Sequence, residues 1–179
     1  MRVLLSIMCC IAVAACAGPV RTNDKDEVKA AVKTTRDENR KAWLVSGPNV
    51  STREGRTGVL EAVALDAILM DNGSVTYSLH IVGTPSLDQG PYAVAYDADG
   101  ERFTLETGRS SGHFSTPITS RYLTRHLSTG INMKVVGPGF EEKFSIPKSY
   151  IAGFLNGVWP LVVGQLPVIV VEYVQTGIR

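Results

Sequence analysis

Residues 59–82 read VLEAVALDAILMDNGSVTYSLHIV, which places two apolar runs on either side of the turn sequence Asp71-Asn72-Gly73-Ser74. Asn-Gly between apolar runs is a strong signal for a β-hairpin, because both residues tolerate the positive φ angles of the turn. From Val75 to Val82 polar and apolar residues alternate, so one face of this strand is expected to be buried. The first run, 59–70, would also suit a helix, and the hairpin favours a strand.

Two more hairpins and one further strand are expected. The hairpins pair residues 92–96 with 102–107 around the turn Asp97–Gly100, and residues 131–136 with 140–146 around Gly137–Gly139. The further strand covers residues 41–45 and ends at Ser46-Gly47-Pro48-Asn49. Strands at close spacing with short turns predict a mainly β fold, either a β-sandwich or a barrel-like antiparallel sheet.

Two short helices are expected within this β fold. One covers residues 120–127, with Tyr122, Leu123, His126 and Leu127 on one side and Gly130 past its end. The other covers residues 147–157, opened by Pro147 and stopped by Gly157.

The C-terminal residues 158–174 are very apolar, but Pro160 and Pro167 argue against a membrane span. They are interpreted as a buried strand, whose core is the β-branched run 168–174. The alternative is an exposed apolar strand that docks a partner by edge pairing.

The N-terminal segment has the pattern of a secretory signal. Met1-Arg2 is a short positive region, residues 3–15 form an apolar run, and small residues lead up to Cys16. The run is too short and too poorly flanked for a spanning helix, so we expect residues 1–15 to be removed.

The sequence Val13-Ala14-Ala15-Cys16 resembles the lipobox of bacterial lipoproteins. In that family the cysteine thiol receives a diacylglycerol, the signal is cut before it, and the new amine is acylated. The resemblance implies that Cys16 is the lipid attachment residue, and Ala17 in place of an aspartate implies the outer membrane. The alternative is an ordinary signal peptide cut at Ala15 or Ala17, with Cys16 incidental.

The other cysteines fit this interpretation. Cys9 and Cys10 leave with the signal, so Cys16 would be the sole cysteine of the mature chain and no internal disulfide is expected. Residues 60–158, which include SIPKSYIAGFL at 145–155, loosely resemble uncharacterised proteobacterial envelope lipoproteins. That second resemblance implies no activity.

The expected domain organisation has two parts after the signal. Residues 16–39 are a lipid-anchored tether followed by a charged spacer or a short helix, in which Asp24 and Glu27 have the spacing of a capping box. Residues 40–179 form a single mostly-β domain. The formal charge of +1 falls to zero when Arg2 is removed, which argues against nucleic-acid binding.

No catalytic residue is assigned. Gly108–Gly112 matches the spelling G-x-S-x-G of a hydrolase nucleophile elbow around Ser110, which requires the chain order serine, acid, histidine. Every acidic residue after Ser110 also follows His126, the last histidine, so the order fails. We interpret the match as a flexible loop.

No metal or cofactor site is assigned either. Asp97–Glu101 resembles the opening of a calcium loop but lacks a third oxygen ligand before the glycine and a closing glutamate. The three histidines lack the sequence spacing of a zinc site. His80 is expected at the surface and His126 is expected to be half-buried. The fold could bring His113 and His126 together, but nothing in the sequence requires it. Arg121 and Arg125, four apart on one helix face, are a weak signal for an anionic partner.

The leading hypothesis is a non-enzymatic outer-membrane lipoprotein, anchored by its N-terminal lipid with the domain in the periplasm. It would bind another envelope protein. The alternative is a carrier of a small ligand or a lipid, which requires a sizeable apolar cavity between the sheets. A serine hydrolase that joins Ser110 to His113 or His126 ranks last.

Overall fold

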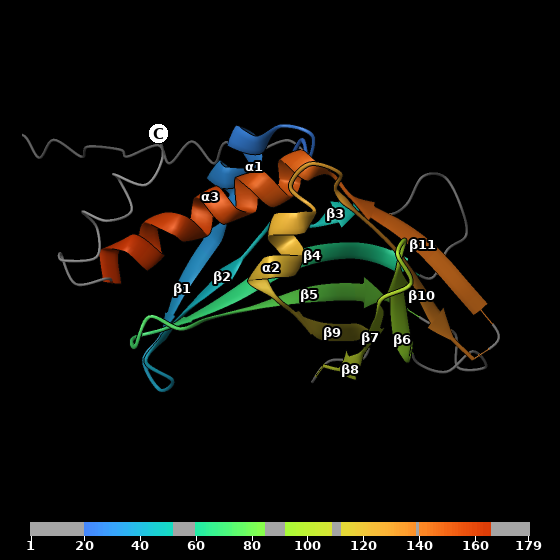
Figure 1. Ribbon diagram of the computed structural model, residues 1–179. Helices are drawn as coiled ribbons and strands as arrows, with labels where there is room; N and C mark the ends of the chain where they lie inside the picture. The colour runs from blue at the N-terminus through green and yellow to red at the C-terminus, as the bar shows by residue number, and fades with distance from the viewer. Residues whose placement is uncertain (1–19, 52–59, 85–91, 109–111, 139, 166–179) are drawn as a thin grey trace, which may run out of the picture.

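The computed structural model describes residues 20–51, 60–84, 92–108, 112–138 and 140–165. Within them the chain is mainly β, with eleven strands in two antiparallel sheets and three helices. The predicted fold class is therefore confirmed. The two sheets are open and lie in a sandwich-like arrangement instead of closing into one barrel (Figure 1).

The larger sheet has seven strands in the order β1-β2-β4-β5-β9-β8, with β3 also paired to β4. Its strands are β1 Lys33–Asp37, β2 Ala42–Ser46, β3 Val50–Ser51, β4 Leu60–Met70, β5 Val75–Gly83, β8 Glu106–Thr107 and β9 His113–Ile118. Strands β4 and β5 form the hairpin predicted at 59–82, with Leu69 opposite Val75 and Gly73 at a φ of 83° in the turn.

The smaller sheet has four strands in the order β11-β10-β6-β7. They are β6 Val94–Asp97, β7 Arg102–Thr104, β10 Ile131–Gly137 and β11 Phe140–Ile146, which confirms the other two predicted hairpins. Strand β6 also pairs with β10, and this places Met133 opposite Asp97. The chain passes from β7 to β8 through the buried Leu105, so one short segment links the two sheets.

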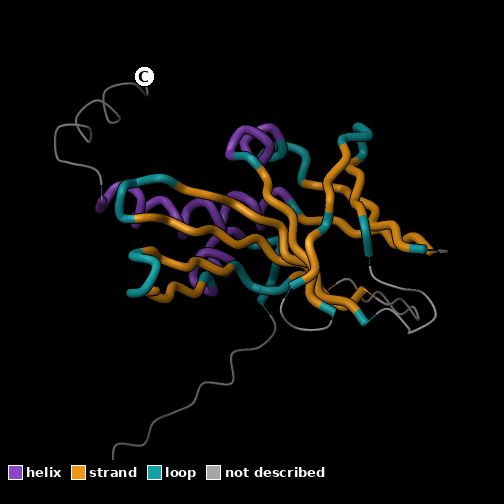
Figure 2. Tube along the Cα trace, turned by 90° about the horizontal axis from the view of Figure 1, so that it is seen from below, coloured by secondary structure: helices purple, strands orange, loops and turns teal. Residues whose placement is uncertain are grey.

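The helices are α1 Lys25–Ala31, α2 Ser120–Arg125 and α3 Lys148–Gln165. Helices α1 and α3 lie together on one face of the larger sheet (Figure 1), and from below the strands lie in front of α3 (Figure 2). The hydroxyl of Thr119 accepts a hydrogen bond from the Tyr122 N–H and caps α2. After the helix, Gly130 has a φ of 80°, as expected for a glycine past a helix end.

A single buried cluster joins both sheets to α3. It includes Leu65 of β4, Val135 and Phe144 of the smaller sheet, and Ile151 and Phe154 of α3. Because these side chains from both sheets pack together, the described residues give no support to the carrier hypothesis, which required a sizeable cavity between the sheets.

Helix α3 is longer than predicted. It continues through Gly157 and Pro160 to Gln165, so the predicted stop at Gly157 is wrong, as is a strand over residues 158–165. Ile151, Phe154 and Val158 are fully or almost fully buried and fall at helical spacing, so the apolar stripe of the helix continues past Gly157. The predicted strand at 168–174 lies outside the described residues.

Gly157 serves helix packing instead of helix termination. A Cβ atom at this position would lie 2.8 Å from Cγ2 of Val32, so only glycine lets the segment after α1 approach α3 this closely.

The segment before residue 40 belongs to the domain, so the predicted boundary there is wrong. Of the two alternatives for the charged stretch, the short helix is the one found, capped by the Asp24 carboxylate, which accepts bonds from the Asp26 and Glu27 N–H groups. Val28 of this helix has no exposed surface. Strand β1 then pairs with β2, so residue 40 falls inside a hairpin of the larger sheet.

Strand β9 was not predicted. It pairs with β5 on one side and with the two-residue β8 on the other. Strand β8 pairs only with Phe114 and Ser115 of β9, so beside Pro117 that side of β9 has no partner strand among the described residues. The missing N–H group of the proline therefore costs no hydrogen bond on that side. Within the described part of the chain, no helix is long and apolar enough to cross a membrane.

Candidate functional site

Two residues singled out from the sequence, Cys16 and Ser110, lie outside the described residues. The structure therefore does not test the lipid anchor or the hydrolase geometry at Ser110. It does place all three histidines.

Two of the histidines form a pair on neighbouring strands. His80 Nε2 lies 3.1 Å from His113 Nδ1, and the two rings stack with centroids 5.2 Å apart. On its other side, His80 Nδ1 lies 3.7 Å from a carboxylate oxygen of Asp66. His113 thus has His80 as its partner, and His80 is half-buried instead of lying free on the surface. Burial raises the pKa of Asp66, and a hydrogen bond with Ser46 and the nearby His80 act against the rise.

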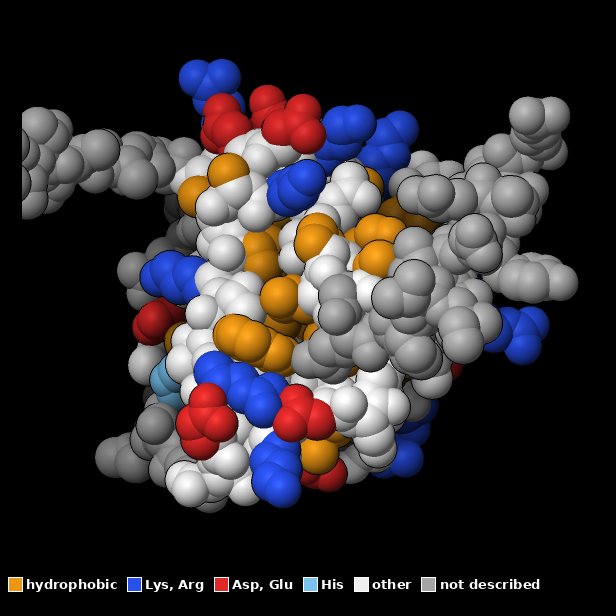
Figure 3. All heavy atoms as spheres, turned by 90° about the vertical axis from the view of Figure 1, so that its left-hand side faces the viewer, with side chains coloured by type: hydrophobic (Ala, Val, Ile, Leu, Met, Phe, Trp, Pro, Cys, Tyr) orange, Lys and Arg blue, Asp and Glu red, His pale blue; other side chains and the backbone are white. Residues whose placement is uncertain are grey.

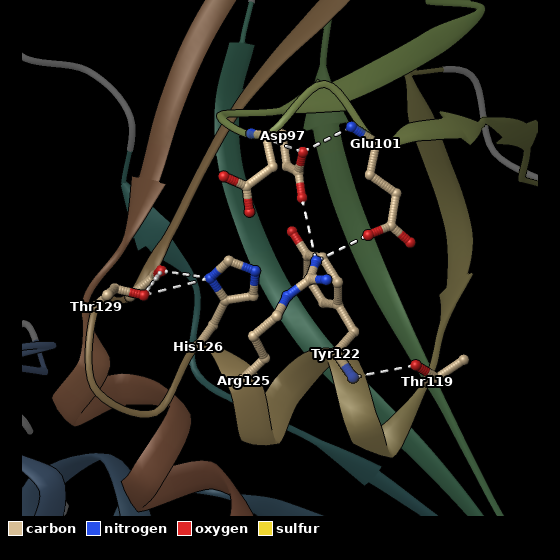
Figure 4. A network of polar contacts seen from close by, with 9 residues as sticks. Asp97, Glu101, Thr119, Tyr122, Arg125, His126 and Thr129 are labelled. Atoms are coloured by element: carbon tan, nitrogen blue, oxygen red, sulfur yellow. Dashed lines mark hydrogen bonds and ion pairs between the residues drawn. The ribbon is translucent and has the colours of Figure 1, made fainter.

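The third histidine faces the turn between β6 and β7. We call Asp97, Asp99 and His126 the turn cluster, because one possible ligand atom of each lies within 4.8 Å of the others. Asp97 ends β6, Asp99 lies in the turn, and His126 caps the C-terminal end of α2. Asp97 and His126 are buried, with 7% and 9% of their surface exposed, whereas Asp99 is exposed. Figure 4 shows Asp97 and His126 approaching one another from the turn and the helix.

The two carboxylate oxygens of Asp97 have different environments. Oδ1 accepts hydrogen bonds from the N–H groups of Asp99, at 3.0 Å, and Glu101, at 2.8 Å, and so holds the turn. Oδ2 is buried and has no hydrogen bond within the described part of the chain, and the Arg125 guanidinium lies 3.5 Å from it. The same Arg125 nitrogen lies closer to Glu101, at 2.8 Å, so the arginine is held mainly by that exposed carboxylate.

The hydrogen bonds of His126 define its tautomer. Nδ1 lies 2.9 Å from the carbonyl oxygen of Gly130, and because a carbonyl only accepts, Nδ1 carries a proton. In the neutral ring Nε2 then holds a lone pair. Nε2 is buried and has no hydrogen-bond partner among the described residues. Leaving a buried polar atom unsatisfied costs on the order of 1–3 kcal/mol.

A third unsatisfied polar atom lies beside the turn cluster. The Tyr122 hydroxyl is buried, has no hydrogen-bond partner among the residues that the structure describes, and points toward Asp97 (Figure 4). Burial raises the pKa of Tyr122, and the negative charge of Asp97 adds to the rise. The phenol therefore stays protonated at neutral pH.

Arg121 and Arg125 of α2, a weak sequence signal for an anionic partner or a lipid headgroup, both line one surface cavity. Arg125 pairs with Glu101 and Asp97, and its guanidinium lies 5.1 Å from the centre of the Tyr122 ring. Its charge is therefore used within the molecule. An open cavity of about 280 Å³ lies beside this network and is lined by Glu101, Thr119, Arg121, Tyr122 and Arg125.

A second surface feature is apolar. We call it the apolar groove; its volume is about 200 Å³, and it is lined by Tyr77, Leu155, Val158, Trp159 and Val162, with Ser120 and Thr124. Trp159 is 51% exposed. Figure 3 looks onto the end of the molecule that carries the C-terminal part of α3, and shows hydrophobic side chains gathered between charged side chains above and below.

No protein-family model, curated protein or solved structure matches this chain. The turn cluster and the apolar groove are therefore interpreted from their own geometry and chemistry.

The sequence pattern placed two of the three turn-cluster residues together. The alternating carboxylates Asp97 and Asp99 were singled out as a partial calcium loop, and the third ligand before the glycine was missing. In the structure the third group comes from His126, which follows β8 and β9 in the sequence. No spacing rule joins these residues, because only the packing of α2 against the β6–β7 turn brings them together.

Proposed function

We propose that the protein is a non-enzymatic lipoprotein of the outer membrane, anchored through Cys16, whose periplasmic domain binds another envelope protein. The observation that carries the binding role is the apolar groove, where Trp159 is half exposed beside Leu155 and Val162. Exposed aromatic side chains next to an apolar pocket are typical of the anchor points of protein interfaces.

The size of the groove favours a protein partner over a carried ligand. Sites that bury a small molecule usually measure about 300–1,000 Å³. The groove measures about 200 Å³, which suits one or two apolar side chains. None of the described residues that line it is charged, and Ser120 and Thr124 are its polar members. We therefore propose that its occupant is an apolar side chain of a partner protein.

The lipid anchor would favour binding at this small groove by keeping the domain at the membrane. Three acyl chains exceed the two lipid signals that stable membrane attachment needs, so the domain would remain beside membrane-bound partners. Confinement raises the effective concentration of the partner without any new contact.

The test is site-specific photo-crosslinking in cells. A photoreactive amino acid replaces Leu155 in the groove, and the matched control carries it at Leu127, a 38% exposed residue that lines a different surface cavity. We expect one discrete adduct from position 155, none of the same mass from position 127, and loss of the adduct when Trp159→Ala is added.

The captured partner is then purified and titrated against the protein. Removal of an anchor residue costs at least about 2 kcal/mol, so Trp159→Ala should weaken binding about 30-fold. Equal adducts from both positions, or equal affinity of the Trp159→Ala variant, would contradict the proposal.

A further inference from the structure

We propose that the turn cluster of Asp97, Asp99 and His126 binds a divalent transition-metal cation of the Zn²⁺ class. The site is distinct from the apolar groove and does not depend on the proposed binding role. It departs from the sequence analysis, which assigned no metal site.

The first argument is the convergence of three ligands of two types from two parts of the chain. Two carboxylates of the β6–β7 turn and an imidazole from the end of α2 place their ligand atoms within 4.8 Å of one another. Ligands at about 2.0–2.2 Å from a Zn²⁺ ion lie about 3.3–3.6 Å apart in a tetrahedral site. Separations of up to 4.8 Å are longer than this, so binding requires the ligand atoms to come closer together, and Asp99 is the exposed member of the cluster.

The second argument is the state of His126. Its Nδ1–H donates to the Gly130 carbonyl, so the lone pair of the neutral ring is on Nε2. Metal-binding histidines characteristically donate their second ring N–H to a carbonyl or carboxylate, which fixes the tautomer and orients the free nitrogen toward the ion. Here the free nitrogen belongs to a residue that is 9% exposed, and it has no hydrogen-bond partner in the described part of the chain.

The third argument is the second carboxylate oxygen of Asp97. Oδ1 is used by the turn, whereas Oδ2 is buried and has no hydrogen bond among the described residues. Arg125 lies 3.5 Å from Oδ2 but 2.8 Å from Glu101. An ion can therefore take Oδ2 as a ligand while Arg125 keeps its closer partner.

The ligand types select the class of ion. Imidazole together with carboxylates suits Zn²⁺ and its neighbours, whereas Ca²⁺ and Mg²⁺ prefer ligand sets made of oxygen alone. Three protein ligands, one of them exposed, leave a fourth position for water or for an external ligand. A bound ion would fasten the end of α2 to the β6–β7 hairpin of the smaller sheet.

The experiment measures metal binding by the full chain, purified in detergent and stripped with EDTA. The protein is titrated with Zn²⁺ in a calorimeter and, in parallel, with Ca²⁺. We expect one Zn²⁺ per chain and much weaker Ca²⁺ binding. Asp99→Asn and His126→Gln should each lower Zn²⁺ affinity at least about 10-fold.

His113→Gln is the matched control, because His113 and His80 form a second place where Zn²⁺ could bind. Affinity that falls with His113→Gln and not with His126→Gln overturns the proposal, as do the absence of Zn²⁺ binding and a preference for Ca²⁺. Because His126 is buried and its replacement can unfold the domain, Asp99→Asn, at an exposed position, gives an independent answer, and circular dichroism reports the fold of each variant.

A second measurement follows His126 in the intact protein. In ¹⁵N NMR spectra of the ring nitrogens, Nδ1 of His126 should carry a proton in the apo protein, and Zn²⁺ should shift the Nε2 resonance. A proton on Nε2 that persists in the presence of Zn²⁺ would show that the buried nitrogen donates to a carboxylate instead, and it would overturn the proposal.

Discussion

The phenol of Tyr150 offers the clearest test of how α3 is fixed to the larger sheet. Tyr150 has no exposed surface, and its hydroxyl donates to the Pro48 carbonyl at 2.6 Å and accepts from the Leu65 N–H at 3.2 Å. Strand β4 pairs with β2 over residues 66–70 and with β3 at residues 62–63, so Leu65 lies in the gap between these partners. The Tyr150 hydroxyl therefore accepts the hydrogen bond of the Leu65 N–H in place of a neighbouring strand.

Tyr150→Phe removes only that oxygen. The Leu65 N–H would remain fully buried without a partner, at a cost of about 1–3 kcal/mol, whereas the half-buried Pro48 carbonyl would lose about 0.5–1.5 kcal/mol. We therefore expect the free energy of unfolding to fall by about 2–4 kcal/mol. This is a large share of the roughly 5–15 kcal/mol typical of a domain.

The assay is urea unfolding followed by circular dichroism, with the midpoint expected to fall while the m-value stays constant. Tyr77→Phe is the matched control, because Tyr77 is half-buried and its hydroxyl makes no hydrogen bond to the described residues. This control should lose less than about 0.5 kcal/mol. A loss for Tyr150→Phe no larger than that of the control would refute the reasoning.

Three further predictions address helix packing, pH and the anchor. Gly157→Ala should lower the free energy of unfolding by about 1 kcal/mol, because overpacking against Val32 outweighs the better helix propensity of alanine. In a double-mutant cycle, adding Val32→Ala should relieve most of this loss. Burial raises the pKa of Asp66, so the folded protein binds a proton more tightly than the unfolded chain, and stability should fall as pH rises from the ordinary pKa of 3.8 through the raised value. Urea unfolding measured across this pH range should show a smaller pH dependence of stability for Asp66→Asn than for the unaltered protein. An equal slope in both would mean that another group causes the pH dependence. Cys16→Ser should release the protein from sedimented membranes, and unchanged sedimentation would contradict the lipid anchor.

Local sequence signals were sufficient for the hairpins. Asn72-Gly73 lies between two apolar runs, and Gly73 and Gly100 both have positive φ angles in the turns where they were expected. Turn chemistry acts over a few residues and needs no tertiary context.

Strand β1 and strand β9 gave no such signal. Residues 33–37 are Lys-Thr-Thr-Arg-Asp, which form an edge strand without an apolar face, and β9 contains Pro117. An edge strand such as β1 depends on pairing with a neighbour more than on burial of its own side chains, so its composition does not reveal it. Strand β9 lies between β5 and the short β8, and Pro117 counts against a strand in the sequence because proline cannot donate a hydrogen bond to a neighbouring strand.

The sequence by itself determined the mainly β class, the three hairpins and the short helix that begins at Ser120, since each depends on contacts between residues close in the chain. Only the tertiary structure decided the length of α3, because glycine by itself favours a helix end, whereas Gly157 lies inside the helix and permits close packing beside Val32. Only the tertiary structure joined Asp97 and Asp99 to His126, and exposed Trp159 on the apolar groove. These features arise where elements distant in sequence pack together, and the distances between their atoms follow from the packing of the whole domain.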